Sequence, residues 1–498
     1  MLRTPSGAAD GEVDSLACWF PPRSGNQRTY ASRVREPDTE TPAPEDAATA
    51  AGESSETDEV TSERPAQLGD TVTWIAIVAA GIFAQLLVTI NGVLAARMLG
   101  VEGRGQVVLV VALSTMASQL TLGGGLPNAL TKLLAERGVT TRDGVGHLVP
   151  QWLLISLVPS TIAAGYLLYL ERDSSGGTKY ALAIALAVMA IQTMGLRVLI
   201  GAMLGEGTPL LSFTITNFAP QAAVTAALGL AFAFGARLNA VELLAVMIGS
   251  ALLTSAARLF ALRKPTRNPK DRIEGKEVWA LTRQNHVGSV GPIDGLSIDR
   301  TLVGSLLGNA QLGLYSAAFA LAGLTNIIGG CLSMVVLPRV AVVQSDPEAE
   351  RVAVRRWLSV SAGLILACVV TLAVLAEPVL RIAFGRDYFG DHFTATVHCA
   401  YWLIAAGGLL SFRRVLIAVL QARGRGGWAS WIEIALTPFV VLGVWIASID
   451  DSLLDVGITM FAVGAIGCLM LGTAAHRSRP TGDGPEAGAL PPELPITT

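Results

Sequence analysis

The sequence predicts an all-α polytopic membrane protein, with about 12 transmembrane helices in two pseudo-symmetric six-helix lobes around a central cavity. Three observations predict this fold class: an apolar composition, a series of long hydrophobic segments, and an internal repeat. Of the 498 residues, 51% are hydrophobic and 15% are charged, and the mean hydropathy is +0.52. Soluble domains carry about 25% charged residues, so this composition argues against a soluble enzyme.

The two ends of the chain differ from the part between them. Residues 1–70 hold six Arg against 14 Asp and Glu, and they are rich in Pro, Ser and Thr. Such a segment buries too little apolar surface to offset its ordering entropy, so we expect a disordered acidic tail. No apolar run follows a basic start, so we expect no signal peptide. A second disordered tail is expected at residues 476–498.

Between these tails the chain is a series of apolar segments. A hydrocarbon core of ~30 Å requires roughly 20 helical residues. The predicted spans are 72–99, 105–127, 147–170, 180–204, 210–234, 239–262, 285–307, 312–337, 352–376, 393–420, 427–449 and 453–475. The segment 285–307 is the least apolar, because it contains Asp294, Asp299, Arg300 and several glycines.

The loop charges predict the orientation of these spans. With the N-terminus inside, the inner loops and C-terminal tail hold 18 Lys and Arg, and the outer loops hold seven. The positive-inside rule then places both termini in the cytoplasm. Because this requires an even number of spans, it supports segment 285–307. The lobes are expected at 71–262 and 285–475. We interpret the basic connection 263–284 as a cytoplasmic linker, with contact to anionic lipid as the alternative.

The two halves repeat each other in sequence. A shift of 208 residues aligns six residues of the first half with identical residues of the second. These are Leu94, Leu99, Gly100, Gly105, Ala112 and Leu113, which match Leu302, Leu307, Gly308, Gly313, Ala320 and Leu321. A shift of 217 aligns Arg197 with Arg414, in the fourth span of each half. Repeats that run in the same direction are related by an axis along the membrane normal, an architecture typical of transporters.

Several of these segments resemble a known family. Two segments of this chain, Asn91–Gly100 and Gly103–Gln106, are similar to the first hairpin of polysaccharide-biosynthesis flippases. The segments Ile298–Arg300, Leu312–Ala322 and Leu337–Arg339 are similar to their seventh and eighth spans. These flippases are the O-antigen and exopolysaccharide exporters of the multidrug/oligosaccharidyl-lipid/polysaccharide exporter (MOP) superfamily.

The resemblance covers roughly residues 72–475, and it implies a function. Such proteins are flippases of the bacterial inner membrane that move an undecaprenyl-pyrophosphate-linked oligosaccharide or polysaccharide precursor by alternating access. The resemblance implies a lipid-linked oligosaccharide and membrane lipids as partners, together with a polysaccharide polymerase and glycosyltransferases. It implies no cofactor, although H⁺ or Na⁺ coupling is common in the family. No nucleic-acid partner is expected.

An anionic cargo head requires a hydrated, electropositive cavity, even though an Arg near mid-membrane costs roughly 2.5–3.5 kcal/mol. Five basic residues lie within the predicted spans: Arg197, Arg258, Arg300, Arg413 and Arg414. We predict that the repeat-related Arg197 and Arg414 face the cavity and bind the pyrophosphate, for which guanidinium geometry is suited. The alternative is that they snorkel to the inner interface, which is the reading we favour for Arg258 and Arg413. Asn91 and Arg300 are further candidates for the substrate-binding cavity.

The carboxylates within the spans are candidates for ion coupling. Asp299 and Asp294 are predicted to form an H⁺ or Na⁺ coupling site. The alternative is a structural ion pair that fixes the lobes. Adjacent positions on a helix point about 100° apart, so one of Asp299 and Arg300 can face the cavity while the other pairs across helices. We expect Glu433 to neutralise Arg413 or Arg414.

Other activities are less compatible with the sequence. It has no G-x-x-x-x-G-K-[ST] motif for nucleotide hydrolysis, and its Cys and His residues lack metal-site spacing, so no metal site and no enzyme activity are predicted. A lipid II flippase remains open as an alternative. So do a multidrug/cation antiporter of the same superfamily and a polytopic glycosyltransferase or polymerase.

Overall fold

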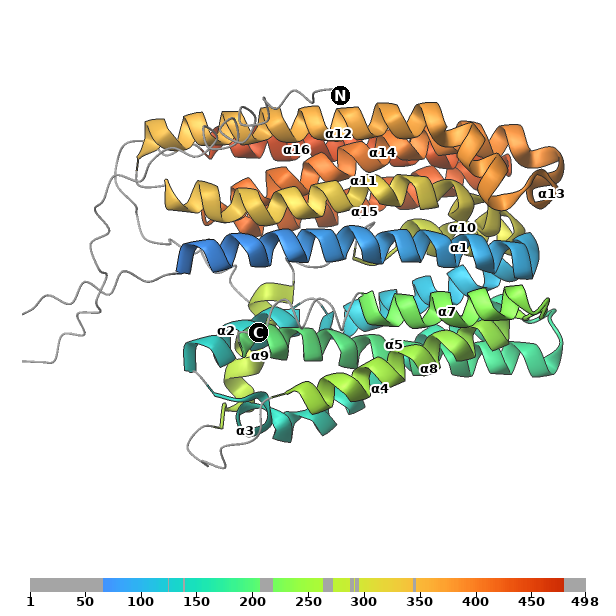
Figure 1. Cartoon of the computed structure of the whole chain (residues 1–498), viewed down its shortest axis with the longest axis horizontal. Helices are drawn as coiled ribbons and strands as arrows, with labels where there is room; N and C mark the ends of the chain where they lie inside the picture. The colour runs from blue at the N-terminus through green and yellow to red at the C-terminus, as the bar shows by residue number, and fades with distance from the viewer. Residues whose placement is uncertain are drawn as a thin grey trace, which may run out of the picture. The chain divides into compact units, whose positions relative to one another are not determined.

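The computed structural model describes residues 66–123, 125–137, 139–206, 218–262, 272–286, 291, 295–343 and 346–478. Every regular element in these ranges is helical, and nine of their helices are long and apolar enough to cross a membrane. Figure 1 shows these helices lying side by side. The chain is a multi-pass membrane protein.

The first half of the chain forms one group of packed helices. The first helix has a non-helical residue at Gly100 (φ 70°), where the chain turns back, so that this helix supplies two spans. A positive φ favours glycine because it has no Cβ. The helices are α1 (Ala66–Ser118), α2 (Gly125–Arg137), α3 (Thr141–Gly144), α4 (Val149–Leu170), α5 (Gly176–Gly205), α7 (Ala219–Ala233) and α8 (Ala240–Ala261).

The second half forms a second group, centred on its fourth span. The span at Gly390–Ala422 is the most buried of the nine, and its helix packs against the four other long helices of the group. The helices are α10 (Ile298–Leu306), α11 (Gly308–Val342), α12 (Pro347–Phe384), α13 (Arg386–Phe389), α14 (Phe393–Ala422), α15 (Gly426–Ile449) and α16 (Leu453–Arg477). The two groups meet chiefly where α1 packs on α10 and α11. The predicted all-α fold with two lobes is confirmed.

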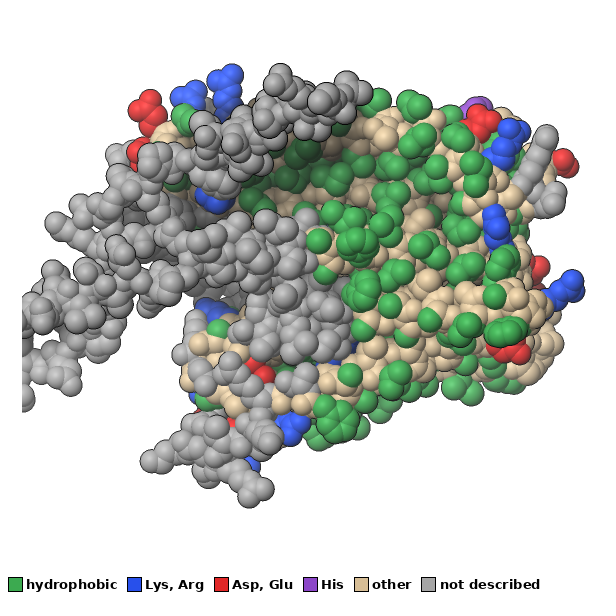
Figure 2. Space-filling model, viewed as in Figure 1, with side chains coloured by type: hydrophobic (Ala, Val, Ile, Leu, Met, Phe, Trp, Pro, Cys, Tyr) green, Lys and Arg blue, Asp and Glu red, His purple; other side chains and the backbone are tan. Residues whose placement is uncertain are grey.

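The helix bundle has a hairpin end and a linker end. The hairpin end contains Gly100, Gly308 and α13, and the linker end contains the last turn of α2 and helix α9 (Gly275–His286). Figure 2 shows hydrophobic side chains over the visible face between the two ends, where Lys, Arg, Asp and Glu are sparse. Exposed apolar side chains of the long helices include Leu253, Val374 and Leu469, as expected for a surface that faces lipid.

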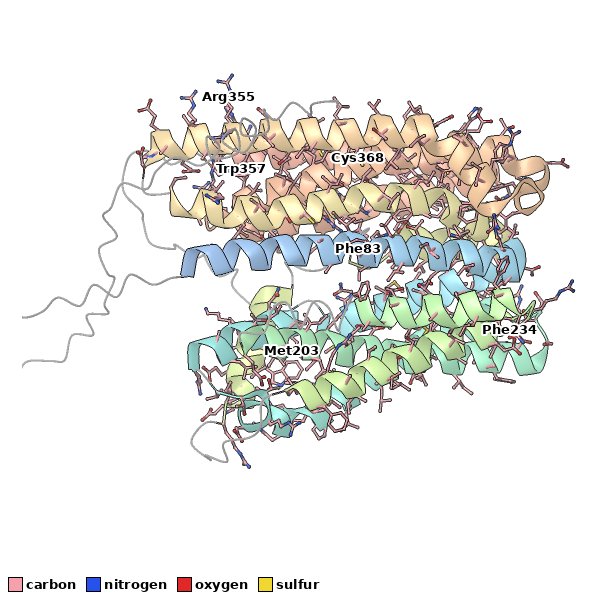
Figure 3. The ribbon with its side chains drawn as sticks, in the orientation of Figure 1. Phe83, Met203, Phe234, Arg355, Trp357 and Cys368 are labelled. Carbon is pink, nitrogen blue, oxygen red and sulfur yellow. The ribbon has the colours of Figure 1, made fainter. Side chains whose placement is uncertain are left out.

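The linker helix α9 packs on the first lobe. Its Val278 joins a buried cluster with Leu130, Trp152 and Met203, the last of which is labelled in Figure 3. Glu277 pairs with Arg137 at the end of α2. The described part of the predicted linker 263–284 is therefore an ordered helix on the lobe surface.

The structure differs from the prediction at the first and seventh spans. The first helix begins at Ala66, and the described part of span 210–234 begins at the π-helical Phe218 and continues as α7. The seventh span, predicted as a continuous segment, is interrupted: α9 ends at His286 and α10 begins at Ile298. Helix-breaking residues are frequent between these two helices, as in the Gly291–Pro292 pair, and Gly and Pro are the weakest helix formers. The predicted tails lie outside the described residues, except for 66–70 and 476–478.

A close helix contact holds the centre of the second lobe together. A Cβ built on Gly329 of α11 would lie 2.5 Å from the Cα of Ser411 on α14. The Ser411 hydroxyl donates to the carbonyl of Thr325 at 2.7 Å. Small residues therefore allow these two backbones to approach, as is typical of membrane helices.

Replacing Gly329 with Leu should separate α11 from α14 and destabilise the protein by about 1–3 kcal/mol or more, as overpacking does. The matched control is Gly363→Leu on α12, where a new side chain meets open space. The melting midpoint in detergent measures the difference. Equal midpoints for the two variants would contradict the role of this contact.

Candidate functional site

The two predicted cargo-binding arginines lie in different lobes. Arg197 is half-buried on α5, and Arg414 is half-buried on α14. Arg414 donates from Nη1 to the carbonyl of Asn326 on α11 at 3.1 Å. Helix α11 also packs against α1 of the other lobe. Arg414 therefore contacts a helix that lies at the boundary between the lobes.

The neighbouring Arg413 is held differently. It is 1% exposed, and its Nη2 lies 2.8 Å from Oε2 of Glu433 on α15. Of the two predicted partners of Glu433, the structure assigns Arg413. The snorkelling prediction is wrong for Arg413 and for Arg258, which is fully buried. A charge removed from water requires a partner of opposite charge, and a partner within the lobe makes snorkelling unnecessary for Arg413.

The acidic residue of the seventh span lies inside the second lobe. Asp299 is 1% exposed, and its Oδ2 accepts a hydrogen bond from the hydroxyl of Tyr315 at 2.8 Å. The adjacent Arg300 is half-buried, with its guanidinium carbon 4.3 Å from the ring centroid of Phe319. Asp294, the other predicted coupling residue, lies outside the described residues.

Sequence reasoning missed Tyr315 as the partner of Asp299. Tyr315 belongs to the Leu312–Ala322 segment, but the contact depends on the chain turning at Gly308 so that α11 lies beside α10. Glu433 lies near the same interrupted span: a Cβ on Gly291 would be 3.2 Å from Oε2 of Glu433.

Asn91, at the repeat position of Asp299, makes a different set of contacts. Its amide nitrogen donates to the backbone carbonyl and side-chain oxygen of Gln221 on α7, at 3.2 and 3.1 Å. Its amide oxygen accepts from the hydroxyl of Thr225 at 2.7 Å. Asn91 is therefore held within the first lobe by neutral groups, whereas Asp299 presents a carboxylate within the second.

Part of the chain matches a known protein family in sequence. The family described as polysaccharide biosynthesis protein matches residues 222–390, from α7 to the start of the segment between α13 and α14. Among curated proteins, none matches the chain in sequence.

Solved structures share the fold across most of the described chain. An inward-facing multidrug resistance MATE family transporter of the MOP superfamily is 15% identical, with a TM-score of 0.62, over 82% of this chain and 99% of that one. A MOP superfamily transporter from Pyrococcus furiosus, whose binding pocket is described as having reverse polarity, is 16% identical with a TM-score of 0.57, over 82% and 96% of the two chains. An outward-facing MATE transporter is 15% identical with a TM-score of 0.53, over the same shares.

These findings confirm the resemblance to polysaccharide-biosynthesis transporters of the MOP superfamily. The chain has the fold of the MOP superfamily structures, with two lobes of six helices. Among the described residues, no group of three His, Cys, Asp or Glu side chains could hold a metal ion.

Removing one partner of the Arg413–Glu433 pair should be strongly destabilising. Arg413→Met leaves the Glu433 carboxylate buried, and an uncompensated buried charge costs about 3–5 kcal/mol. The double variant Arg413→Met with Glu433→Met removes both charges and should recover most of that loss. Melting midpoints of the purified variants check this prediction, and a double variant no more stable than the single one would contradict it.

Proposed function

We propose that this membrane transporter of MOP fold is a flippase for an undecaprenyl-pyrophosphate-linked oligosaccharide or polysaccharide precursor in the bacterial inner membrane. The proposed mechanism is alternating access between the two lobes. Both termini then lie in the cytoplasm, which the loop charges favour, and the hairpin end faces the periplasm. A polysaccharide polymerase and glycosyltransferases are the expected functional partners.

The observation that carries this proposal is an arginine at the same repeat position of each lobe. Arg197 and Arg414 are both half-buried, so neither side chain is sealed away from a ligand as Arg413 is. A pyrophosphate carries several acceptor oxygens, and guanidinium groups bind such oxygens in pairs. One arginine from each lobe would keep the cargo bound while the lobes rock about the joint.

The matched segment supports the same cargo class. Residues 222–390 correspond to a family described by polysaccharide biosynthesis, and they include Arg300 and the interrupted seventh span. The lipid tail can stay in the bilayer during transport, because the lobe exteriors are apolar. Only the charged head and the glycan then require a polar path.

Replacing Arg197 or Arg414 with Ala should lower flipping about tenfold each, because a hydrogen bond to a charged group contributes about 1.5–3 kcal/mol. Lysine should restore part of the loss, since it keeps the charge but not the bidentate geometry. The measurement uses proteoliposomes containing an undecaprenyl-pyrophosphate oligosaccharide and a membrane-impermeant glycan probe.

The matched control is Arg355→Ala on α12, where Figure 3 shows the arginine at the edge of the bundle. Unchanged flipping with Ala at both Arg197 and Arg414 would refute the proposed binding pair. Flipping of lipid II alone would reassign the cargo. Efflux of a cationic drug without any lipid flipping would favour an antiporter.

We further propose that Asp299 is the coupling residue for H⁺ or Na⁺. Ionisable residues within membrane spans are rare and commonly functional. Asp299 lies in the lobe interior beside an interrupted span, and its hydrogen bond from Tyr315 holds the carboxylate in place. The repeat-related Asn91 has only neutral hydrogen-bond partners among the described residues, so coupling is assigned to the second lobe.

Asp299→Asn should abolish the stimulation of flipping by an imposed H⁺ or Na⁺ gradient, while cargo binding is retained. Tyr315→Phe should weaken the stimulation without removing it, because the carboxylate remains. Asp391→Asn, an exposed carboxylate at the hairpin end, is the control. Full gradient stimulation in Asp299→Asn would exclude this assignment, and loss of cargo binding together with thermal stability would show a structural role instead.

A further inference from the structure

The two lobes touch through their backbones at the hairpin end. A Cβ built on Gly105 of the first lobe would lie 1.8 Å from the carbonyl oxygen of Asn309. A Cβ built on Gly313 of the second lobe would lie 2.1 Å from the carbonyl oxygen of Val101. The 208-residue shift relates Gly105 to Gly313 and Val101 to Asn309, so the two contacts are one contact repeated about the pseudo-twofold axis. No side chain larger than hydrogen fits at either glycine.

Two arginines of the first lobe extend this seam onto the second lobe. Arg97 is exposed, and it donates to the carbonyls of Ala383 and Ile382 at 2.7 and 2.6 Å. These carbonyls belong to the last turn of α12, where the helix dipole is negative. Arg104 is buried, donates to the carbonyl of Ser316 at 3.1 Å, and lies over the ring of Phe384 at 4.8 Å.

One further hydrogen bond crosses the seam, with its donor in the second lobe and its acceptor in the first. Asn309 of the second lobe donates from Nδ2 to Oε1 of Glu171, at the end of α4 in the first lobe, at 2.7 Å. Within the second lobe, the Tyr388 hydroxyl donates to the carbonyl of Gly313 at 3.1 Å. Burial raises the pKa of Tyr388, although the nearby Arg104 opposes the shift, so the phenol stays protonated as a donor.

We propose that these contacts form a latch that holds the lobes closed at the hairpin end and opens and closes in each transport cycle. The latch consists of the reciprocal glycine seam and the side chains of Arg97, Arg104, Glu171 and Asn309. It deepens the proposed function, because it rests on alternating access and assigns the residues that close the outer side. Each of the four side chains meets an acceptor or donor on the other lobe, so rocking of the lobes breaks all of these bonds together.

The chemistry of the latch suits a contact that must break. Among the described residues, the ion pairs between opposite charges lie within a lobe or between the first lobe and its linker helix, including Arg413–Glu433 and Arg423–Glu350. Across the seam, Arg97 and Arg104 instead bind neutral carbonyls. Separating a charge from a neutral acceptor leaves no second buried ion, and Arg97 is already exposed to water. Buried ion pairs thus hold helices of the second lobe together, whereas the two arginines at the seam bind the other lobe through neutral carbonyls.

The test measures the distance between the lobes at the hairpin end, without any cargo. Spin labels are placed at Phe234→Cys, in the first lobe, and Asp391→Cys, in the second. Both positions are exposed, and Phe234 is labelled at this end in Figure 3. The full-length protein, with its native cysteines replaced, is studied in lipid nanodiscs by pulsed electron spin resonance. The short-distance population reports the latched state.

The double variant Arg97→Gln with Arg104→Gln should raise the ratio of long to short distances at least about tenfold, equivalent to about 1.4 kcal/mol. Arg172→Gln is the matched control, because Arg172 lies at the same end but pairs with Asp173 of its own lobe. Unchanged distances in the double variant, with a monodisperse and folded protein, would overturn the latch.

Arg97→Gln alone keeps the inference testable if the buried Arg104 is needed for folding, because Arg97 is exposed. It should shift the same ratio in the same direction by a smaller factor, and no shift would count against the latch. Because the readout requires no substrate, a shifted distance with no lipid flipping would support the latch and reject the cargo. Conversely, unshifted distances together with flipping that depends on Arg197 and Arg414 would support the proposed cargo and reject the latch.

Discussion

The cost of placing a guanidinium group inside a membrane protein is the constraint on which the rest of this structure depends. Nearby partners offset part of that cost for three of the buried arginines. Arg413 pairs with Glu433, and Arg423 binds Glu350 together with the carbonyl of Ala475. Arg104 uses the carbonyl of Ser316 and an aromatic ring. These partners divide the arginines into those that stabilise a lobe and those that join the lobes.

This division has a mechanical consequence. An ion pair within a lobe is expensive to break, because either charge left alone in a low-dielectric interior is strongly destabilising. Two such pairs, Arg413–Glu433 and Arg423–Glu350, tie helices of the second lobe together. The bonds of the exposed Arg97 to carbonyls at the end of α12 can exchange with water at the membrane surface, so a joint that includes them can open. Rigid lobes and a breakable joint are what rocking-type alternating access requires.

The two lobes share a backbone plan but differ in their chemistry. Gly105 and Gly313 occupy equivalent positions and make equivalent contacts, since helix packing at the joint must satisfy both halves of the repeat. Asn91 and Asp299 also occupy equivalent positions, yet the first is held by amide and hydroxyl groups and the second by a phenol. A buried carboxylate in one lobe allows a proton or cation to act on that lobe alone.

Hydropathy, loop charge and the internal repeat determined the span count, the two-lobe fold and the repeat-related arginines from the sequence alone. They could do so because the thickness of the bilayer sets the length of each apolar segment, and this length can be read directly from the sequence. Only the tertiary structure decided that Glu433 pairs with Arg413 rather than Arg414, that Tyr315 meets Asp299, and that Arg104 is buried between the lobes. These helices are apolar on nearly every side, so their sequences carry little information about which face meets which neighbour.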